Sequence, residues 1–205
     1  MGDKNKTDIR NVVRKSYGKI AKNKVNDEGC CGGSIKIKDS AKVLSSKIGY
    51  SDEEISNVPE GANMGLGCGN PQIFAEIKEG ETVIDLGSGA GFDCFLAAKK
   101  VGPKGYVIGV DMTPEMINKS RILSRKHGYT NVDFRLGEIE NLPVADNIGD
   151  VIISNCVINL SPKKQRVYDE AYRVLKKGGR VAISDVVLIK ELTEEMKQDE
   201  KLYCG

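Results

Sequence analysis

The stretch Asp85-Leu86-Gly87-Ser88-Gly89-Ala90-Gly91 decides the fold of this chain. The residues just before it, 81–84, are largely β-branched and apolar, which is typical of a buried parallel strand. The residues just after it, 92–100, carry apolar side chains at helical spacing. The pattern therefore predicts a strand, a sharp glycine turn and a helix N-terminus, whose free N–H groups and partial positive charge suit a ligand.

The glycine spacing favours one class of ligand over another. It reads Gly-x-Gly-x-Gly, and Phe92 departs from the dinucleotide fingerprint. Asp85 precedes the first glycine, where a carboxylate would repel a pyrophosphate but accept from an amino group or a hydroxyl. The motif thus favours a nucleoside with an amino-acid tail, such as S-adenosylmethionine. A nicotinamide dehydrogenase, or a tight turn that only packs a helix on a sheet, stays open at this point.

Composition narrows the functional classes. A chain of 205 residues suffices for one core with an appended segment, and a net charge of +2 does not favour nucleic acid. The sequence has no apolar run long enough to cross a bilayer, and its N-terminus is polar and charged, so we expect a cytoplasmic protein without membrane contact. Six cysteines in that compartment are expected to be reduced and to bind a ligand or catalyse. No cysteine or histidine spacing typical of zinc occurs, so no metal cofactor is expected.

Further strands are predicted to end in polar residues at one edge of the sheet. The second strand, 105–110, leads to Asp111, which is placed to accept both ribose hydroxyls, and to Met112, suited to an adenine face. After the third strand comes Glu138, which would accept from the adenine amino group. The fourth delivers Asn155 and Cys156 to the same edge, where open α/β sheets bind ligands. The residues expected to bind the cofactor are Asp85, Gly87, Ser88, Gly89, Gly91, Asp111, Met112, Gly137, Glu138, Ile139 and Asn155.

The first third of the chain is predicted to hold a helix and two cysteine-bearing loops. A helix over residues 7–24 has a basic outer face, interpreted as solvated. Adjacent Cys30 and Cys31 follow, and because vicinal cysteines rarely bridge each other without strain, each is expected to serve another partner. Cys68 lies in a glycine-rich loop that we expect to be exposed, where reactivity is a better interpretation than packing.

Together these residues resemble a known family. Residues 85–91, Asp111, 137–138 and 173–179 resemble the class I S-adenosylmethionine-dependent methyltransferases over roughly residues 75–190. A finer set resembles the arsenite methyltransferases, which convert trivalent arsenic to methylated arsenicals. That set comprises Cys68 with Asn70, the run 154–160, Cys204, and the paired Cys30 and Cys31.

The resemblance implies an architecture. It is a doubly wound, mostly parallel α/β sheet of order 3-2-1-4-5, and the family adds two further strands and a C-terminal domain that this sequence does not contain. Strand five is then an unpaired edge, and the chain is expected to be truncated before strands six and seven. Residues 1–70 would form an N-terminal helical and cysteine-loop segment that caps the site, and residues 71–205 the S-adenosylmethionine-binding domain.

The resemblance also implies a chemistry. Cys68, Cys156 and Cys204 would hold arsenic(III), a soft ion that prefers thiolates. S-adenosylmethionine would donate the methyl group, and Cys30 or Cys31 would supply electrons, restored by a thiol reductant of the glutathione or thioredoxin type. The substrate would be arsenite or its thiol conjugates, and the protein is expected to be a monomer.

Two other functions remain open from the sequence. The first is a methyltransferase that acts on carbon or oxygen of a small molecule, with incidental cysteines; it predicts full activity after Cys156→Ser. The second is a thiol protein that binds a metalloid without catalysis; it predicts no binding of S-adenosylmethionine.

Overall fold

The computed structural model describes residues 4–22 and 37–190. Its centre is a five-stranded parallel sheet of order β3-β2-β1-β4-β5, which confirms the predicted doubly wound α/β class and strand order. The strands are β1 (Thr82–Leu86), β2 (Tyr106–Asp111), β3 (Val132–Leu136), β4 (Gly149–Asn155) and β5 (Leu175–Ser184).

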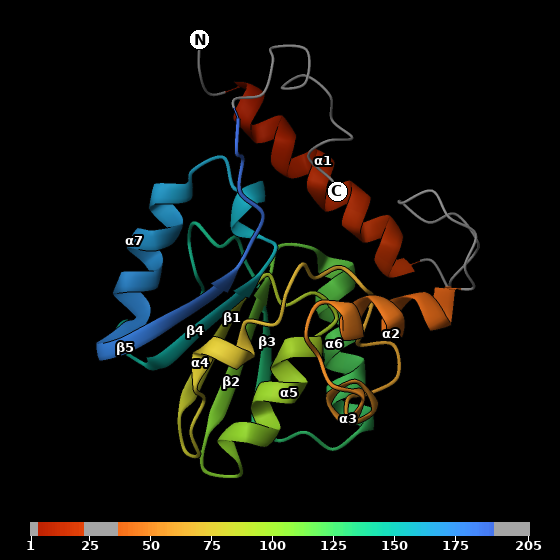
Figure 1. The fold of residues 1–205 in the computed structure, drawn as a ribbon. Coiled ribbons are helices and arrows are strands. Elements are labelled where there is room, and N and C mark those ends of the chain that lie inside the picture. The colour runs from red at the N-terminus through yellow and green to blue at the C-terminus, as the bar shows by residue number, and fades with distance from the viewer. Residues whose placement is uncertain (1–3, 23–36, 191–205) are drawn as a thin grey trace.

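Helices surround the sheet and extend across one end of it. In Figure 1, α1 lies across the upper end of the sheet, and α2 and α3 lie beside it. The short helix α3 begins with the capping box that the sequence predicts, in which Ser51 and Glu54 exchange hydrogen bonds. The helices are α1 (Lys4–Lys22), α2 (Ile37–Lys47), α3 (Asp52–Ser56), α4 (Gln72–Ala75), α5 (Phe92–Val101), α6 (Pro114–Lys126), the 3₁₀ turn η1 (Ile158–Leu160) and α7 (Lys164–Val174).

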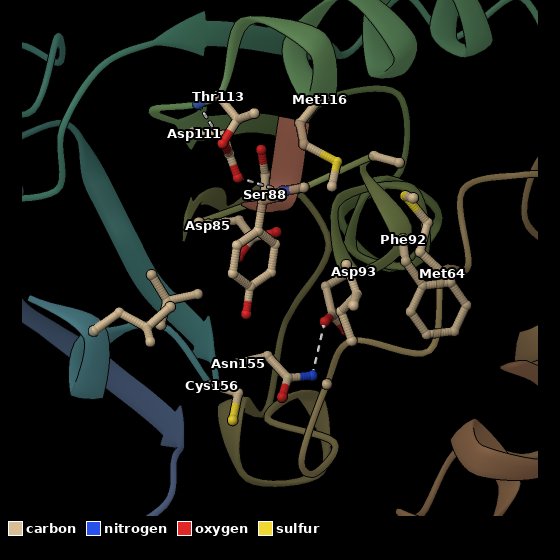
Figure 2. Close-up of a pocket in the computed structure, with 18 of the residues that line it drawn as sticks. Met64, Asp85, Ser88, Phe92, Asp93, Asp111, Thr113, Met116, Asn155 and Cys156 are labelled. Atoms are coloured by element: carbon tan, nitrogen blue, oxygen red, sulfur yellow. Dashed lines mark hydrogen bonds between the residues drawn. The ribbon is translucent and has the colours of Figure 1, made fainter. Parts of the chain in front are cut away.

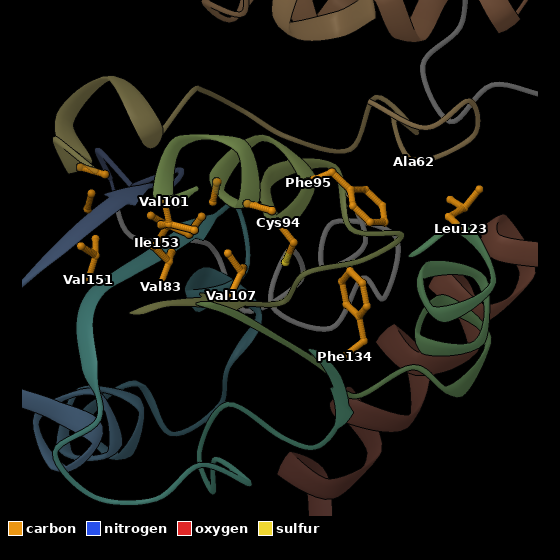
Figure 3. Packing of buried hydrophobic residues seen from close by; sticks show 14 of the residues in the cluster. Ala62, Val83, Cys94, Phe95, Val101, Val107, Leu123, Phe134, Val151 and Ile153 are labelled. Atoms are coloured by element: carbon orange, nitrogen blue, oxygen red, sulfur yellow. The ribbon is translucent and has the colours of Figure 1, made fainter. Parts of the chain in front are cut away.

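Both faces of the sheet are buried, as expected for parallel strands. Alternate residues of β1 point to opposite sides, so Val83 packs into one apolar cluster and Ile84 into another. The first cluster joins the sheet to α5 and α6; Figure 3 shows Val101, Cys94 and Phe95 of α5 above the strand side chains. The second joins the sheet to α7 and to the segment after β3.

Strand order places a binding cleft at the middle of the sheet. β1 pairs with β2 on one side and with β4 on the other, so the direction of winding reverses at the carboxyl end of β1. In open α/β sheets, ligands bind at such a switch point. The glycine turn that follows β1 therefore lies at that position, next to the ends of β2 and β4.

The last strand differs from the prediction. The sequence places a helix end at residues 176–179 and a strand at 180–187, whereas β5 begins at Leu175 and ends at Ser184. Leu175 pairs with Gly149 and Arg180 pairs with Val151, so residues 176–179 form an irregularity inside the strand. The predicted helix over 193–202 lies outside the described residues. Within residues 4–22 and 37–190, no helix has both the length and the hydropathy that a membrane span requires.

Candidate active site

A cavity lies at the carboxyl ends of the central strands. It encloses about 1130 Å³ of empty space, open solvent at its mouth included. Figure 2 shows Asp111 and Thr113 toward one end of it and Asn155 and Cys156 toward the other. Its lining brings together α1, the segment between α2 and α4, the glycine turn, and the ends of β2 and β4. The predicted cofactor-binding residues in the lining are Asp85, Gly87, Ser88, Gly89, Asp111, Met112, Ile139 and Asn155.

The glycine turn is shaped by close packing on one side and open space on the other. A Cβ on Gly87 would lie 2.3 Å from Val157, and its φ of +73° also favours glycine. A Cβ on Gly91 would lie 2.7 Å from Phe134. At Gly89 a Cβ would meet no protein atom within 4 Å, so the space beside it is open. The buried hydroxyl of Ser88, next to it, has no hydrogen-bond partner among the described residues.

Asp111 ends β2 and faces this turn. Its carboxylate accepts a hydrogen bond from the N–H of Gly89 at 2.9 Å and from the N–H of Thr113 at 2.8 Å. Burial raises the pKa of Asp111, and these two N–H donors oppose that effect. The adjacent Met112 and the buried Met116 give the cavity an apolar wall on the same side. This combination fits a ribose next to a flat apolar base.

Asp85 is more deeply buried than the sequence suggests. Its carboxylate accepts a hydrogen bond from the thiol of Cys94 at 3.1 Å. The pKa of Asp85 is raised, mainly by burial and secondly by the nearby Asp93 carboxylate. Cys94 itself is fully buried, and burial raises its pKa.

A polar network lines one end of the cavity, and sequence reasoning did not find it. Asp93, in the first turn of α5, accepts hydrogen bonds from the hydroxyl of Tyr50 at 2.7 Å, from Gln72 at 3.0 Å and from the amide nitrogen of Asn155 at 3.2 Å. Figure 2 shows Asp93 and Asn155 facing each other. Burial raises the pKa of Asp93, and the three donors oppose that effect. An acid in the first turn of a helix looks like an ordinary dipole partner, so the sequence carried no signal for this role.

Two of the predicted arsenic ligands meet at the end of β4. The thiol of Cys68 lies close enough to Cys156 to raise its pKa, and Cys156 lines the cavity. The pKa of Cys156 is raised to about 12. Burial is the largest cause, followed by the nearby Cys68 and then by the Asp185 carboxylate. Cys156 has a φ of +60°, uncommon for a residue with a side chain, and its N–H donates to the carbonyl of Ser184 at 2.7 Å.

The loop of Cys68 packs against the sheet and is not exposed as predicted. Cys68 is half-buried, its N–H donates to Asn155 at 3.0 Å, and its thiol lies 3.6 Å from the carbonyl of Ser184. Its glycine neighbours permit this contact, because a Cβ on Gly67 would lie 2.7 Å from Asn155 and one on Gly69 would lie 2.0 Å from Ser184.

The structure places Glu138 beside α1. It is outside the cavity lining, and its carboxylate pairs with Arg10 and with Arg14 of α1. The basic face of that helix is therefore only partly solvated. Two positions along the chain, Glu140 does line the cavity; it is buried and accepts from Ser161 at 2.6 Å.

The helix α1 covers part of the cavity. Arg10, Val13 and Tyr17 contribute to the lining, while Lys22 pairs with Glu115 at the start of α6. Gly137, another predicted cofactor residue, lines a separate small hollow with Glu138.

The remaining predicted cysteines cannot be placed. Cys30, Cys31 and Cys204 lie outside the described residues. In the part of the chain that is described, no group of three or more histidine, cysteine, aspartate or glutamate side chains could hold a metal ion. The described site therefore offers two of the three predicted thiols.

The residues fit a nucleoside with an amino-acid tail. One wall of the cavity has open space beside Gly89. On the same wall, the Asp111 carboxylate and the Ser88 hydroxyl, which has no hydrogen-bond partner among the described residues, can bind polar groups of a ligand. The walls are otherwise largely apolar, as small-molecule sites are. S-adenosylmethionine has matching parts: a flat base, a ribose diol and a polar tail.

Comparison with known proteins agrees with this geometry. The chain is 50% identical over 214 residues to an arsenite methyltransferase of Halobacterium salinarum, covering all of this chain and 54% of the relative. It is 40% identical over 200 residues to an arsenite methyltransferase of Aquipseudomonas alcaligenes, covering 93% of this chain and 54% of the relative. The chain thus spans about half the length of the curated relatives it matches.

Solved structures give the same result. CrArsM, an arsenic (III) S-adenosylmethionine methyltransferase from Chlamydomonas reinhardtii, matches with a TM-score of 0.61 and 39% identity, over 80% of this chain and 56% of that one. A SAM dependent methyltransferase from Aquifex aeolicus matches with a TM-score of 0.55 and 27% identity, over 76% of this chain and 79% of that one.

A family model described as a methyltransferase domain matches residues 77–205. That range holds the whole parallel sheet, the glycine turn and Cys156. The chain belongs to the methyltransferase domain family.

Proposed function

We propose that this protein transfers the methyl group of S-adenosylmethionine to trivalent arsenic held by Cys68 and Cys156. One observation carries the proposal: the Cys68 thiol and the Cys156 backbone both reach the carbonyl of Ser184 beside the end of β4, and Cys156 lines the same cavity as the glycine turn and Asp111. The identity to arsenite methyltransferases supports it. The proposal concerns a chain about half as long as those relatives.

Arsenic capture requires only exchange of ligands. Each thiol replaces one hydroxyl of arsenous acid, and its proton leaves with that hydroxyl as water, so arsenic remains trivalent and keeps its lone pair. A raised thiol pKa is compatible with this exchange, because the proton has an acceptor in the departing hydroxyl. Cys204 is the third sulfur in the proposal, as the family resemblance implies.

The chain's residues would hold the cofactor as follows. Asp111 would accept from the ribose hydroxyls, Met112 would lie against the base, and Ser88 would contribute its hydroxyl. When bound, S-adenosylmethionine supplies an electrophilic methyl carbon, and its sulfur departs with both electrons of the broken bond. The chain's contribution is to place the arsenic lone pair in line with that bond. Positioning of this kind can supply about 7–11 kcal/mol of the barrier.

Proton transfer plays no part in the methyl step. The arsenic lone pair carries no proton, so no general base is needed. This agrees with the surroundings of Cys156, where the ionisable groups that shift its pKa are Cys68 and Asp185. His127, the only histidine in the sequence, is exposed at the end of α6 and does not line the cavity.

Reduction must follow methylation, because arsenic is then formally pentavalent. In our proposal the thiol of Cys30 or Cys31 attacks the sulfur of Cys68. A disulfide forms, the arsenic–sulfur bond breaks, its electron pair returns to arsenic, and the attacking thiol loses its proton. A cytoplasmic thiol reductant of the glutathione or thioredoxin type would then reduce the disulfide. In this proposal the protein acts as a monomer.

Product analysis tests the proposal. The chain is incubated with arsenite, methyl-labelled S-adenosylmethionine and a thiol reductant, and the arsenic species are separated and counted for label. Labelled methylarsenicals that disappear with Cys156→Ser support the proposal. Methylation of a carbon or oxygen acceptor by Cys156→Ser at the wild-type rate, with no arsenic product from either protein, would instead favour a small-molecule methyltransferase. If neither protein binds S-adenosylmethionine, a non-catalytic thiol protein is favoured.

A further inference from the structure

The amide of Asn155 connects three segments that are distant in sequence. Its oxygen accepts the N–H of Cys68 at 3.0 Å, and its nitrogen lies 2.8 Å from the carbonyl of Gly69 and 3.2 Å from a carboxylate oxygen of Asp93. The loop that carries Cys68 is thus attached to the end of β4, one residue before Cys156. This attachment defines where the Cys68 thiol lies relative to its partner.

The orientation of that amide is decided by its neighbours. If the amide were flipped, its NH₂ group would face the N–H of Cys68, donor against donor. Its oxygen would then face both the carbonyl of Gly69 and the carboxylate of Asp93, acceptor against acceptor. The amide nitrogen also lies 3.0 Å from the hydroxyl oxygen of Tyr50, which can accept there because its own proton goes to Asp93. A charged acceptor makes the stronger hydrogen bond, so Asp93 favours the observed orientation both directly and through Tyr50.

Asp93 is itself held in place by donors. The Tyr50 hydroxyl donates a hydrogen bond to one carboxylate oxygen at 2.7 Å, and the Gln72 amide donates one to the same oxygen at 3.0 Å. With Asn155 on the other oxygen, the group has three donors, which suits a carboxylate anion. Asp93 is 7% exposed, so these bonds form in a region of low dielectric, where they orient strongly.

We propose that Asp93 is a positioning residue for arsenic capture, which acts through Asn155 to keep Cys68 beside Cys156. The proposal rests on the function proposed above and adds to it the residue that sets the spacing of the thiol pair. Asp93 does not touch the arsenic. Its removal should weaken binding of any reagent that must bridge both sulfurs, and should leave each single thiol chemically intact.

Phenylarsine oxide is a suitable probe, because it takes two thiols and releases one water, and so does not require Cys204. We expect Asp93→Asn to weaken its binding at least tenfold, because a second amide nitrogen would face the nitrogen of Asn155. Asp93→Glu keeps a carboxylate as the acceptor for Asn155 and should retain binding to within about threefold of wild type. Thermal unfolding of each variant shows that it is folded.

A second variant covers the case in which Asp93→Asn does not fold. Asn155→Leu keeps the branched shape of the side chain but removes the bridge, and should show the same tenfold loss. Wild-type binding in folded Asp93→Asn or in folded Asn155→Leu would overturn the inference and leave the proposed function standing. If wild-type protein itself does not bind phenylarsine oxide, or if Cys68→Ser binds it equally well, the proposed function fails and this inference fails with it.

Discussion

The side chain of Asn155 accepts the backbone N–H of Cys68 at 3.0 Å, across 87 positions of sequence. Through this bond a residue at the end of β4 determines where a loop before the sheet places its thiol. The adjacent residue, Cys156, meets that thiol at the edge of the cavity. The proposed substrate site is therefore built at a sheet edge by two segments that the fold brings together.

The thiol of Cys156 should be a poor nucleophile in the free protein. Its pKa of about 12, against an ordinary value of 9.0, means that little thiolate exists at neutral pH. At pH 8 we expect iodoacetamide to alkylate it roughly a thousandfold more slowly than an ordinary thiol, and the rate to rise about tenfold per pH unit between 7 and 10. Peptide mapping by mass spectrometry measures this rate.

Asp185 offers a check on the cause of that shift. Its carboxylate raises the pKa of Cys156, so Asp185→Asn should speed alkylation of Cys156 severalfold at pH 8. A matched carboxylate far from the thiols is Asp133, which pairs with Arg135 on β3. Asp133→Asn should leave the rate unchanged. Equal rates in the wild type and Asp185→Asn would show that burial and Cys68 alone hold the proton.

Stability should depend on the same proton. Since the folded chain keeps the Cys156 thiol protonated, ionisation in the unfolded chain favours unfolding above about pH 9. This contribution to the free energy of unfolding is present below pH 9 and is lost as the pH rises. Urea unfolding of wild type and Cys156→Ser between pH 7 and 10 should therefore show a steeper decline for the wild type.

Gly69 should tolerate no side chain while Ser184 is present. A Cβ at Gly69 would lie 2.0 Å from the hydroxyl oxygen of Ser184, so Gly69→Ala must displace the Cys68 loop or strand β5. We expect a loss of about 1–3 kcal/mol in unfolding free energy, as for other overpacked sites, together with weaker arsenite binding. The double variant Gly69→Ala with Ser184→Ala removes the clashing oxygen and should recover most of both. A double variant no better than Gly69→Ala would show that the loop fails for another reason.

The ion pairs of Glu138 should help α1 to cover the cavity. Both Arg10 and Arg14 pair with this carboxylate, and Arg10 also lines the cavity. Exposed pairs contribute about 0–1 kcal/mol each, so Arg10→Gln with Arg14→Gln should raise the dissociation constant of S-adenosylmethionine about three- to tenfold. Calorimetric titration at low salt measures it, and added salt should reduce the difference.

A control variant lies at the other end of the same helix. Lys22 pairs with Glu115 but its side chain is 70% exposed. Lys22→Gln should change cofactor affinity less than twofold. An equal effect from both ends of the helix would mean that the charge of α1, and not the contact with Glu138, matters.

Much of the fold was predictable from local patterns. The run before Asp85, the glycines after it and the capping box at Ser51 each depend on near neighbours in sequence, and the structure has all three. The strand order came from family resemblance and is confirmed. The extent of β5 was not predictable, because Leu175 joins the strand only through its pairing with Gly149 of β4.

In the candidate site, too, some features follow from local sequence and others only from contacts in the folded chain. Asp111 follows from its place at a strand end, and the structure puts it against the glycine turn. The network of Tyr50 and Asp93 depends on three-dimensional contacts that no spacing rule contains. The partner of Glu138 was missed because two arginines more than 100 residues away in sequence reach it from α1. Position along the chain indicates which edge of the sheet a residue reaches, and packing decides which neighbour it meets there.

X-ray absorption spectroscopy of arsenite-loaded protein tests the central claim most directly, because it counts the sulfur atoms bonded to arsenic. We predict three sulfur neighbours per arsenic in the wild type, and fewer in Cys68→Ser and in Cys156→Ser, with S-adenosylmethionine affinity retained in both. Cys94→Ser, which alters a thiol buried away from the pair, should keep the wild-type count. An unchanged sulfur count in Cys68→Ser and Cys156→Ser, or an arsenic bonded only to oxygen in the wild type, would contradict the account.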